Sequence, residues 1–351
     1  MSEERFLLSG NHAIAEAAIR VGCKSFYGYP ITPQSELLEY MARNLPKRGG
    51  RFYQTESEIA AINMMFGEAA TGTRTMTSSS GLGISLMTEG FSHLAAAELP
   101  CVVVNVSRAG PGLGNIMPSQ GDYWQATKGG GHGDFRMIVL GPALVQECAD
   151  LVFEAFYLAD KYRNPVMILT DGATGQMKER VIFKDQEEQS PCEKEWAITI
   201  KEDRDRRVVK SQYAEDNLEE HVKKLIFKYE DLASHHTKYE LFQIKEAEIV
   251  VIAFGICSRV CKGAVKLARE DGIKVGLIRP ITLFPFPYQM INDLAKQVRA
   301  FLTVEMNFGQ MLEDVKIAAQ GTRVEFYGRF GGFIPSPKEI FEKIKEINTH
   351  L

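Results

Sequence analysis

The sequence predicts an α/β protein built from two parallel-sheet domains. Short segments rich in Val, Ile and Phe alternate with longer segments whose apolar residues recur at helical spacing, and this alternation is typical of parallel strands joined by helices. The alternation stops after about residue 175, where a charged stretch begins, and resumes near residue 247. We therefore predict an α/β domain over 1–183, a charged helical linker over 184–244 and a smaller α/β domain over 245–351.

The first domain is predicted to alternate helices and strands from its start. Its first helix is expected to end at Val21, just before Gly22, and glycine is favoured just after a helix C-terminus. Its clearest strand is CVVVNVS at 101–107, which is apolar on both faces, as in a strand covered by helices on each side of a sheet. Helices are expected over 11–21, 35–44, 57–70, 83–97 and 143–162, and strands over 24–29, 51–54, 74–79, 101–107, 135–140 and 165–171.

The second domain repeats this rhythm after the linker. The linker is rich in Lys, Glu, Asp and Gln, and its one amphipathic stretch, 217–236, is expected to form a helix on the protein surface. Beyond it, strands are expected over 248–254, 274–280, 301–306 and 323–328, and helices over 258–270, 288–298 and 310–319.

Composition excludes several classes of protein. Apolar residues make up 45% and charged residues 25% of the 351 residues, as in a globular protein with a buried core rather than a disordered or collagenous one. The 41 basic and 45 acidic side chains give a net charge of −4, so nucleic acid and anionic membrane surfaces are not expected partners. The N-terminus has no apolar signal segment and the longest apolar stretch is too short to span a bilayer, which predicts a cytoplasmic protein.

The cysteines argue against disulfides and metal clusters in this chain. There are six, widely scattered, and no CxxC pair occurs. Cys257 and Cys261 are four apart, which stacks them on one helix face, and we expect reduced cysteines that lie partly in the core. No metal-binding residues are predicted.

Glycines cluster in the loop that follows the apolar strand. The segment 108–133 holds eight glycines in 26 positions, whereas 30 in 351 would place about two there. Such a loop at the carboxyl end of a buried strand lies where open α/β sheets bind ligands, although a flexible surface loop is the alternative. Arg108 opens the loop and suits a clamp on a carboxylate or phosphate, or else a salt bridge within the fold. No P-loop motif occurs, and Ser80 to Gly83 is a weak dinucleotide fingerprint.

Two further segments contain candidate residues. In YPITP, Thr32 is predicted to cap a helix whose first residue is Pro33, which would aim free N–H groups at a small carboxylate; a merely well-capped helix is the alternative. In QTESE, Glu56 and Glu58 lie between a predicted strand and a helix rich in small residues. Carboxylates are common in a first helical turn for reasons of the helix dipole alone, so this segment by itself does not establish a site.

Taken together, these segments resemble the α subunit of 2-oxoacid:ferredoxin oxidoreductases. The resemblance rests on YPITP-x-S, on E-x-E-x-x-A, on S-x-G-x-G-x-S-L-M-x-E-G over 79–90 and on V-x-V-S-R-x-G-P over 104–111. IRPITLFPFP at 278–287, VEMNFGQM at 304–311 and GRFGG at 328–332 resemble the second domain of the same subunit. The match keeps its order through nearly the whole chain apart from the linker.

The resemblance implies a fold and a reaction. The fold is a thiamine-enzyme pyrimidine-binding-like domain followed by a transketolase C-terminal-like domain. Such enzymes decarboxylate a 2-oxoacid on thiamine diphosphate, pass electrons through iron-sulfur clusters to ferredoxin and release an acyl-coenzyme A. In this family the α subunit holds the aminopyrimidine, and a β subunit holds the diphosphate and its Mg²⁺. The sequence agrees, because it contains neither the GDG-and-Asn diphosphate motif nor clustered cysteines.

The resemblance also implies roles for individual residues. Glu58 matches the glutamate that hydrogen-bonds N1′ of the aminopyrimidine, with Glu56 as the second candidate, while Thr32 and Arg108 match the residues that bind the 2-oxoacid carboxylate. The positions that we expect near the cofactor are Glu58, Tyr29, Pro30 and Gly81.

The resemblance also implies a substrate, for which one alternative remains, and a set of partner subunits. The short linker, the GRFGG motif and the length resemble the branched-chain 2-oxoisovalerate subgroup, with 2-oxoglutarate as the alternative substrate. The implied partners are a β subunit, a γ subunit, a ferredoxin-like δ subunit carrying clusters, ferredoxin and coenzyme A. Two other interpretations are a non-catalytic assembly subunit and a self-contained thiamine enzyme of the transketolase type; the missing diphosphate motif counts against the latter.

Overall fold

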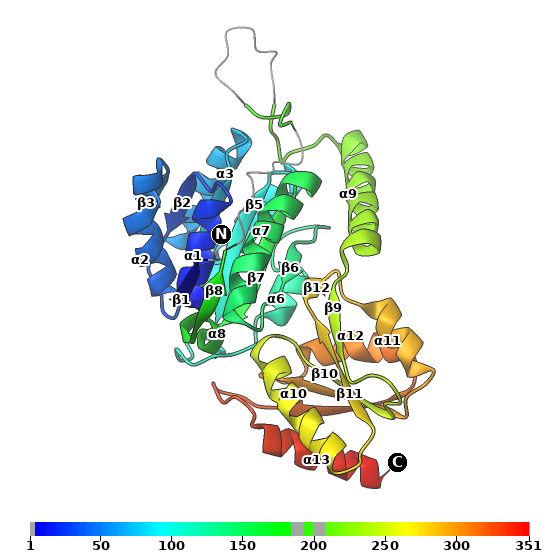
Figure 1. The fold of residues 1–351 in the computed structure, drawn as a ribbon. Helices are drawn as coiled ribbons and strands as arrows, with labels where there is room; N and C mark the ends of the chain where they lie inside the picture. The colour runs from blue at the N-terminus through cyan, green and yellow to red at the C-terminus, as the bar shows by residue number, and fades with distance from the viewer. Residues whose placement is uncertain (1–3, 184–192, 199–207, 351) are drawn as a thin grey trace.

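A computed structural model describes residues 4–183, 193–198 and 208–350 of the chain. It contains two large sheets, each with helices on both faces (Figure 1). The first sheet has seven strands in the order β12-β6-β7-β5-β4-β2-β3, and every neighbouring pair is parallel except β12 with β6. Its strands are β2 (Ser25–Gly28), β3 (Arg51–Gln54), β4 (Thr75–Ser79), β5 (Cys101–Ser107), β6 (Ile138–Leu140), β7 (Pro165–Asp171) and β12 (Thr282–Phe284).

Two sets of helices cover the first sheet. The helices of the first set pack their apolar residues against one face of the sheet. The helices of the second set pack theirs against the other face. The first set is α1 (Gly10–Arg20), α2 (Ser35–Asn44) and α7 (Val145–Tyr162). The second is α3 (Glu58–Ala70), α4 (Leu82–Leu86), α5 (Thr88–Ala96) and α6 (Tyr123–Thr127).

The second sheet has five strands in the order β14-β13-β10-β11-β9. Its strands are β9 (Tyr239–Phe242), β10 (Ile249–Ile252), β11 (Val275–Pro280), β13 (Ala300–Glu305) and β14 (Arg323–Gly328). Its helices are α10 (Gly255–Glu270), α11 (Tyr288–Ala295), α12 (Gln310–Ala319) and α13 (Pro337–Thr349). All of its strand pairs are parallel except β9 with β11.

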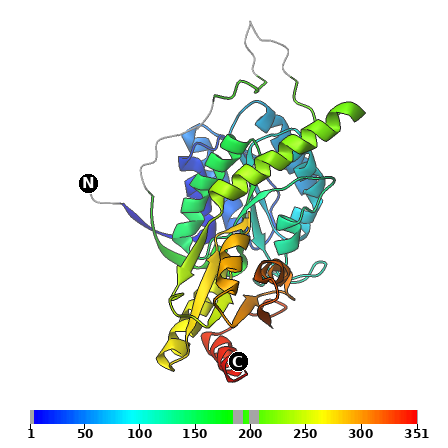
Figure 2. The ribbon, with the colours of Figure 1, turned by 90° about the vertical axis from the view of Figure 1, so that its right-hand side faces the viewer.

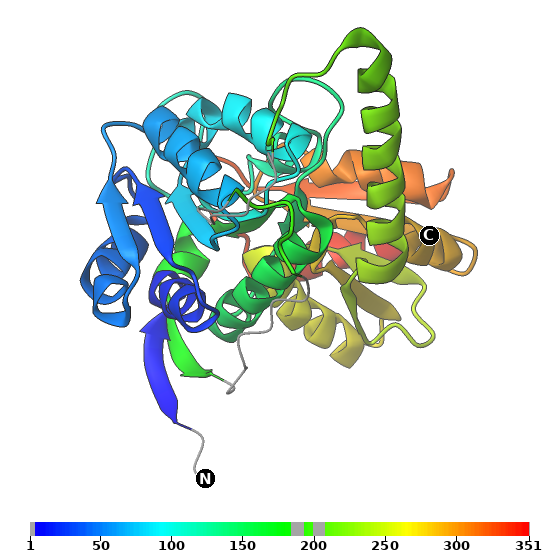
Figure 3. The same cartoon turned by 90° about the horizontal axis from the view of Figure 1, so that it is seen from above.

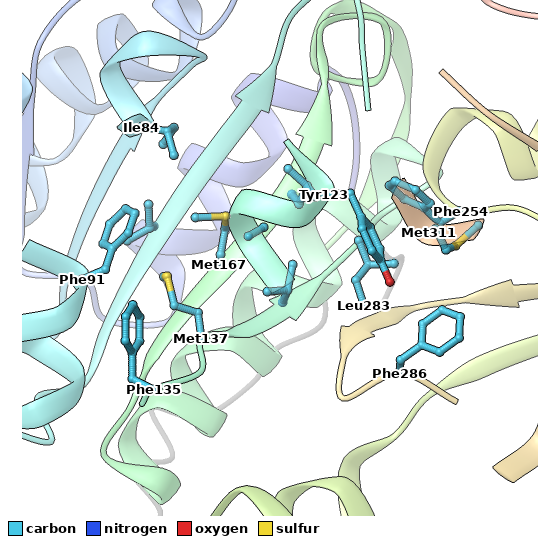
Figure 4. Packing of buried hydrophobic residues seen from close by; sticks show 14 of the residues in the cluster. Ile84, Phe91, Tyr123, Phe135, Met137, Met167, Phe254, Leu283, Phe286 and Met311 are labelled. Carbon is cyan, nitrogen blue, oxygen red and sulfur yellow. The ribbon is translucent and has the colours of Figure 1, made fainter. Parts of the chain in front are cut away.

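The two sheets share one apolar core. A single buried cluster includes Phe91 and Met167 from the first domain and Phe254 and Met311 from the second (Figure 4). Tyr123 of α6 lies between them, with its ring centroid 5.6 Å from that of Phe254. Because apolar burial of this kind stabilises association roughly in proportion to area, we expect the domains to keep one arrangement.

The linker helix α9 (Glu215–His236) lies alongside the first domain (Figures 2 and 3). Tyr162 of α7 donates a hydrogen bond to Asp231, and Lys224 and Lys228 of α9 pair with Glu98. The predicted surface helix at 217–236 is therefore present. No helix in the described ranges is both long and apolar enough to cross a bilayer.

Several elements differ from the sequence prediction. The predicted helix 83–97 divides into α4 and α5, because the N–H of Met87 donates to Ile84 O, three residues back, and tightens the last turn of α4. β9 comes from the predicted linker but pairs with β11, and β12 comes from the predicted second domain but pairs with β6.

Other helices and strands also lie outside the sequence prediction, among them α6 and a 3₁₀ helix at Pro46–Arg48. β1 (Arg5–Ser9) and β8 (Lys178–Ile182) form a separate antiparallel pair, and α8 (Gly172–Gln176) is a short helix after β7. α13 is also absent from the prediction, although its sequence contains a helix-start signal. Ser336 and Glu339 form a capping box before a stripe of apolar residues.

Candidate active site

The candidate residues lie where three neighbouring strands of the first sheet end. β2, β4 and β5 are adjacent and parallel, so the segments that follow them meet at one edge. β2 leads to α2 on one face of the sheet, whereas β3 leads through α3 on the other face to β4. Such a reversal opens a crevice at the carboxyl ends of the strands, where α/β proteins bind ligands.

Glu58 is buried at the start of α3, with 4% of the residue's surface exposed. Ser57 caps the helix with its hydroxyl, so Glu58 is the first helical residue. The hydroxyl of Ser79, the last residue of β4, donates to Glu58 Oε1 at 3.2 Å. A Cβ atom at Gly83 would lie 2.3 Å from the same oxygen, so only glycine at 83 leaves room for the carboxylate.

Glu56, the second candidate for the same role, lies in a different environment. Its side chain is exposed and accepts a hydrogen bond from Ser57 Oγ at 2.9 Å. Of the two glutamates, only Glu58 faces the turn that follows β4.

Arg108 crosses the crevice between the ends of β5 and β2. Its Nη1 donates to the carbonyl oxygen of Thr32 at 3.0 Å. A Cβ atom at Gly81 would lie 3.1 Å from Arg108 Nε, and Gly81 has φ of +53°, a conformation that favours glycine. The structure thus brings Thr32, Gly81 and Arg108 together, with Glu58 on the other side of the same turn.

The predicted cap at Thr32 is wrong. α2 begins at Ser35 with Gln34 at the cap position, and Thr32 is an exposed residue of the preceding turn. The turn closes through the N–H of Gln34, which donates to Ile31 O at 3.1 Å, so the helix cannot start earlier. Tyr29 and Pro30 are exposed beside it.

Gln34, which the sequence reasoning missed, holds the YPITP segment in place. Its side chain is fully buried, donates from Nε2 to Tyr29 O at 3.1 Å and accepts from Ser78 Oγ at 2.6 Å. A hydrogen-bonded buried amide of this kind fixes the loop relative to β4.

A cavity of about 620 Å³ opens at this edge of the sheet, between the two domains. The first domain contributes Gly81, Arg108 and Asp122 to its wall, and the second contributes Phe308 and Phe330. The rings of Trp124 and Phe308 meet edge to face, with centroids 5.2 Å apart. Residues of the glycine-rich loop over 108–112 and 119–124 therefore contribute to a wall of this cavity, whereas those over 113–117 and 128–133 are exposed.

Gln120 fixes this loop to the second domain. Its side chain donates to Phe254 O at 2.9 Å and accepts from Met306 N at 3.1 Å, while its carbonyl accepts from Asn307 Nδ2 at 2.8 Å. All of these groups are buried. Two walls of the cavity are thus joined by hydrogen bonds.

Asp122 was also missed by the sequence reasoning. It lines the cavity, and its Oδ2 accepts a hydrogen bond from Asn105 Nδ2 at 3.0 Å. Burial raises the pKa of Asp122, while the amide of Asn105 and the charge of Arg108 oppose that rise. The sequence feature that could have pointed to Asp122 is its position in the glycine-rich loop.

The cysteines of the described segments are free and buried, and burial raises the pKa of Cys101 and Cys148. Cys192 lies outside the described residues. Within the described ranges, no group of three or more His, Cys, Asp or Glu side chains is arranged to hold a metal ion.

Comparison with known protein families supports the resemblance to 2-oxoacid:ferredoxin oxidoreductases. A model of the thiamine diphosphate-binding domain of pyruvate flavodoxin/ferredoxin oxidoreductases matches residues 16–241, and one of core domain II of pyruvate:ferredoxin oxidoreductase matches 247–340. Ketoisovalerate oxidoreductase subunit VorB of Methanothermobacter thermautotrophicus is 49% identical to this chain, and the match covers 97% of both proteins. 2-Oxoglutarate synthase subunit KorA of the same organism is 38% identical, and the match covers 99% of this chain and 100% of KorA.

Solved structures show the same fold. The 2-oxoglutarate:ferredoxin oxidoreductase from Magnetococcus marinus, with 2-oxoglutarate, coenzyme A and succinyl-CoA bound, has a TM-score of 0.88 and 27% identity, and the match covers 98% of this chain and 65% of that one. A split gene transketolase has a TM-score of 0.58 and 14% identity over 96% of this chain and 93% of its own. The predicted fold class is confirmed, and the chain belongs to the 2-oxoacid:ferredoxin oxidoreductase family.

Proposed function

We propose that this chain is the subunit of a branched-chain 2-oxoacid:ferredoxin oxidoreductase that holds the aminopyrimidine half of thiamine diphosphate. The proposed substrate rests on the chemical character of the residues that line the cavity. Among the described residues that line it, Arg108 is the only cation, and the side chains of Leu82, Trp124 and Phe308 make much of the remainder apolar. A substrate with one carboxylate and a branched apolar side chain matches such a wall.

The residues of the crevice fit the aminopyrimidine. Glu58 accepts one hydrogen bond among the described residues, from Ser79, whereas a carboxylate has about four acceptor sites. Gly83 leaves open the space beside the Glu58 carboxylate that a larger residue would fill. Thiamine diphosphate, when bound, supplies the nucleophilic carbon that attacks the 2-oxo group and accommodates the electrons left by CO₂. Glu58 would hold a proton shared with a ring nitrogen and so orient that ring.

Arg108 would bind the substrate carboxylate. Its guanidinium borders the cavity and, within the described part of the chain, donates one hydrogen bond, to Thr32 O, which leaves its other N–H groups to a ligand. A guanidinium binds a carboxylate with two parallel hydrogen bonds, which fixes orientation as well as position. Thr32 would contact the same carboxylate from the YPITP side, and Tyr29, Pro30 and Gly81 border the cofactor.

The remaining parts of the site would come from partner subunits. The sequence contains no GDG diphosphate motif, so we assign the diphosphate and its Mg²⁺ to a β subunit. Large exposed apolar side chains near the cavity, namely Leu82, Leu86, Leu113, Phe308 and Phe330, would suit burial against that subunit. A γ subunit, a ferredoxin-like δ subunit with iron-sulfur clusters, ferredoxin and coenzyme A complete the proposed assembly. The cytoplasmic location stays a prediction.

The direct test is purification of the complex from its native cell. Reduction of ferredoxin or viologen would be assayed with coenzyme A and a panel of 2-oxoacids. We expect kcat/KM for 3-methyl-2-oxobutanoate to exceed that for 2-oxoglutarate at least about tenfold, a difference of about 1.4 kcal/mol in transition-state binding. Preference for 2-oxoglutarate would establish the alternative substrate. A complex that contains the chain but turns over no 2-oxoacid would favour the non-catalytic assembly subunit.

A further inference from the structure

Asp122 is a partly buried carboxyl group at the cavity, and the proposed reaction gives it no role. It lies just before α6, within the glycine-rich loop, and it borders the same space as Arg108. Among the described residues of the cavity wall it is the only acidic one. A charged group in such a position influences which ligands the cavity accepts.

Asp122 is attached to the same sheet face as Glu58. Asn105, which donates to Asp122, is fully buried on β5 and pairs in register with Ser79 of β4. Residues paired in this way point to the same side of a parallel sheet, and Ser79 is the residue that donates to Glu58. The side chains of Ser79 and Asn105 thus form a polar row between the two carboxyl groups.

The backbone on either side of Asp122 is held by α12. Gln310 donates from Nε2 to Gly121 O at 2.7 Å and accepts from Trp124 N at 2.9 Å. The N–H of Gly121 also donates to Ser119 Oγ at 3.0 Å. With its neighbours fixed, Asp122 cannot move far from the cavity when a ligand enters.

We propose that Asp122 is a specificity-determining residue that excludes 2-oxoacids carrying a second carboxylate. The first carboxylate of any 2-oxoacid pairs with Arg108, the one cation of the described wall. A second carboxylate in the same cavity finds no further cation among those described wall residues and meets the negative charge of Asp122 instead. Like charges brought together in a partly desolvated space oppose binding strongly. A branched aliphatic side chain meets no such repulsion.

This inference rests on the proposed function, and Asp122→Asn in the assembled enzyme tests it. Asparagine keeps the size of the side chain and removes its charge. Asn105 Oδ1 is buried without a partner among the described residues, so Asn105 can rotate its amide and accept from the new one. We expect kcat/KM for 2-oxoglutarate relative to 3-methyl-2-oxobutanoate to rise at least about tenfold, mainly through a lower KM for 2-oxoglutarate.

Two further variants separate charge from structure. Asp122→Glu keeps the charge and should keep the discrimination, whereas Asp134→Asn removes an exposed carboxylate of the same loop region and should leave the ratio unchanged. Glutarate should inhibit turnover of 3-methyl-2-oxobutanoate at least about tenfold more strongly in Asp122→Asn than in the unmodified enzyme. An equal fall in kcat/KM for both substrates in Asp122→Asn would indicate a structural role and overturn the proposal.

The outcomes distinguish this inference from the proposed function. If the unmodified enzyme prefers 2-oxoglutarate, the proposed function fails, and with it the role of Asp122 in excluding that substrate. If the unmodified enzyme prefers 3-methyl-2-oxobutanoate and the ratio in Asp122→Asn stays within about twofold of it, the proposed function stands and the inference about Asp122 fails.

Discussion

Two buried glutamates, one in each domain, lie in similar places and have different surroundings. Glu58 begins α3 beside the first sheet, and Glu305 ends β13 just before α12 in the second. Glu305 accepts hydrogen bonds from Met311 N at 2.8 Å, Asn307 Nδ2 at 2.9 Å and Leu312 N at 3.0 Å. Glu58 accepts one, from Ser79, among the described residues.

The difference in hydrogen bonding separates a structural carboxylate from a candidate catalytic one. Glu305 satisfies the free N–H groups at the start of α12, and burial raises its pKa to about 7 in spite of those bonds. Glu58 keeps acceptor capacity at the edge of a ligand-sized crevice. We therefore expect changes at Glu58 to act on turnover and changes at Glu305 to act on stability.

Glu58→Gln should have the largest effect. The amide cannot hold a proton between itself and a ring nitrogen, so we expect kcat of the assembled enzyme to fall about 10³-fold, with the thermal midpoint unchanged. Glu56→Gln is the matched control, since Glu56 is exposed two residues away. Near-full activity of Glu58→Gln would remove the distinction between the two buried glutamates.

Gly83→Ala should have the next largest effect. Its methyl group would lie 2.0 Å from Ser79 Oγ and 2.3 Å from Glu58 Oε1, so the carboxylate must move. We expect an activity loss of about 10²-fold, since small displacements of a positioned group cost that much. Gly67→Ala in α3 is the control, because a Cβ there meets nothing within 4 Å. Equal activities of the two variants would contradict the account.

Arg108→Ala should act on substrate binding more than on turnover. Loss of the guanidinium removes a charge-assisted contact with the 2-oxoacid carboxylate, and we expect KM to rise about 30-fold, equivalent to about 2 kcal/mol. The measurement is KM and kcat with 3-methyl-2-oxobutanoate as the varied substrate. An unchanged KM would place the carboxylate contact elsewhere.

Glu305→Gln should have the smallest effect on activity and alter the pH dependence of stability. Burial raises the pKa of Glu305 from its ordinary value of 4.5 to about 7, so the folded protein keeps a proton that the unfolded chain releases between these values. Stability therefore falls by about 3 kcal/mol as pH rises through that window. Thermal midpoints at pH 5 and pH 8 should differ less in the variant than in the unmodified enzyme. Equal differences would assign the pH dependence to other groups.

Much of the fold was predictable from the sequence because its strands are short, apolar and separated by helical patterns. The pairing of the linker strand β9 with β11, and of β12 with β6 of the first sheet, was not predictable, since pairing partners depend on contacts far apart in the chain. At the candidate site, motif resemblance singled out Glu58, Thr32 and Arg108, which the structure brings to one edge of the first sheet, and their roles stay predictions.

The supporting groups of the site were less predictable. The sequence carries no signal that Gln34 and Gln120 are buried amides that hold a loop, because the loop atoms to which they donate are backbone carbonyls, which no sequence motif marks. Thr32 was misplaced as a helix cap because a turn through Gln34 N delays the helix.

The most direct test of the central claim is an experimental structure of the assembled enzyme with thiamine diphosphate bound. We predict that a carboxylate oxygen of Glu58 lies within about 2.6–3.2 Å of N1′ of the aminopyrimidine, the range of a hydrogen bond in a catalytic site. An aminopyrimidine ring bound away from Glu58, or held by a residue of another subunit in its place, would contradict it.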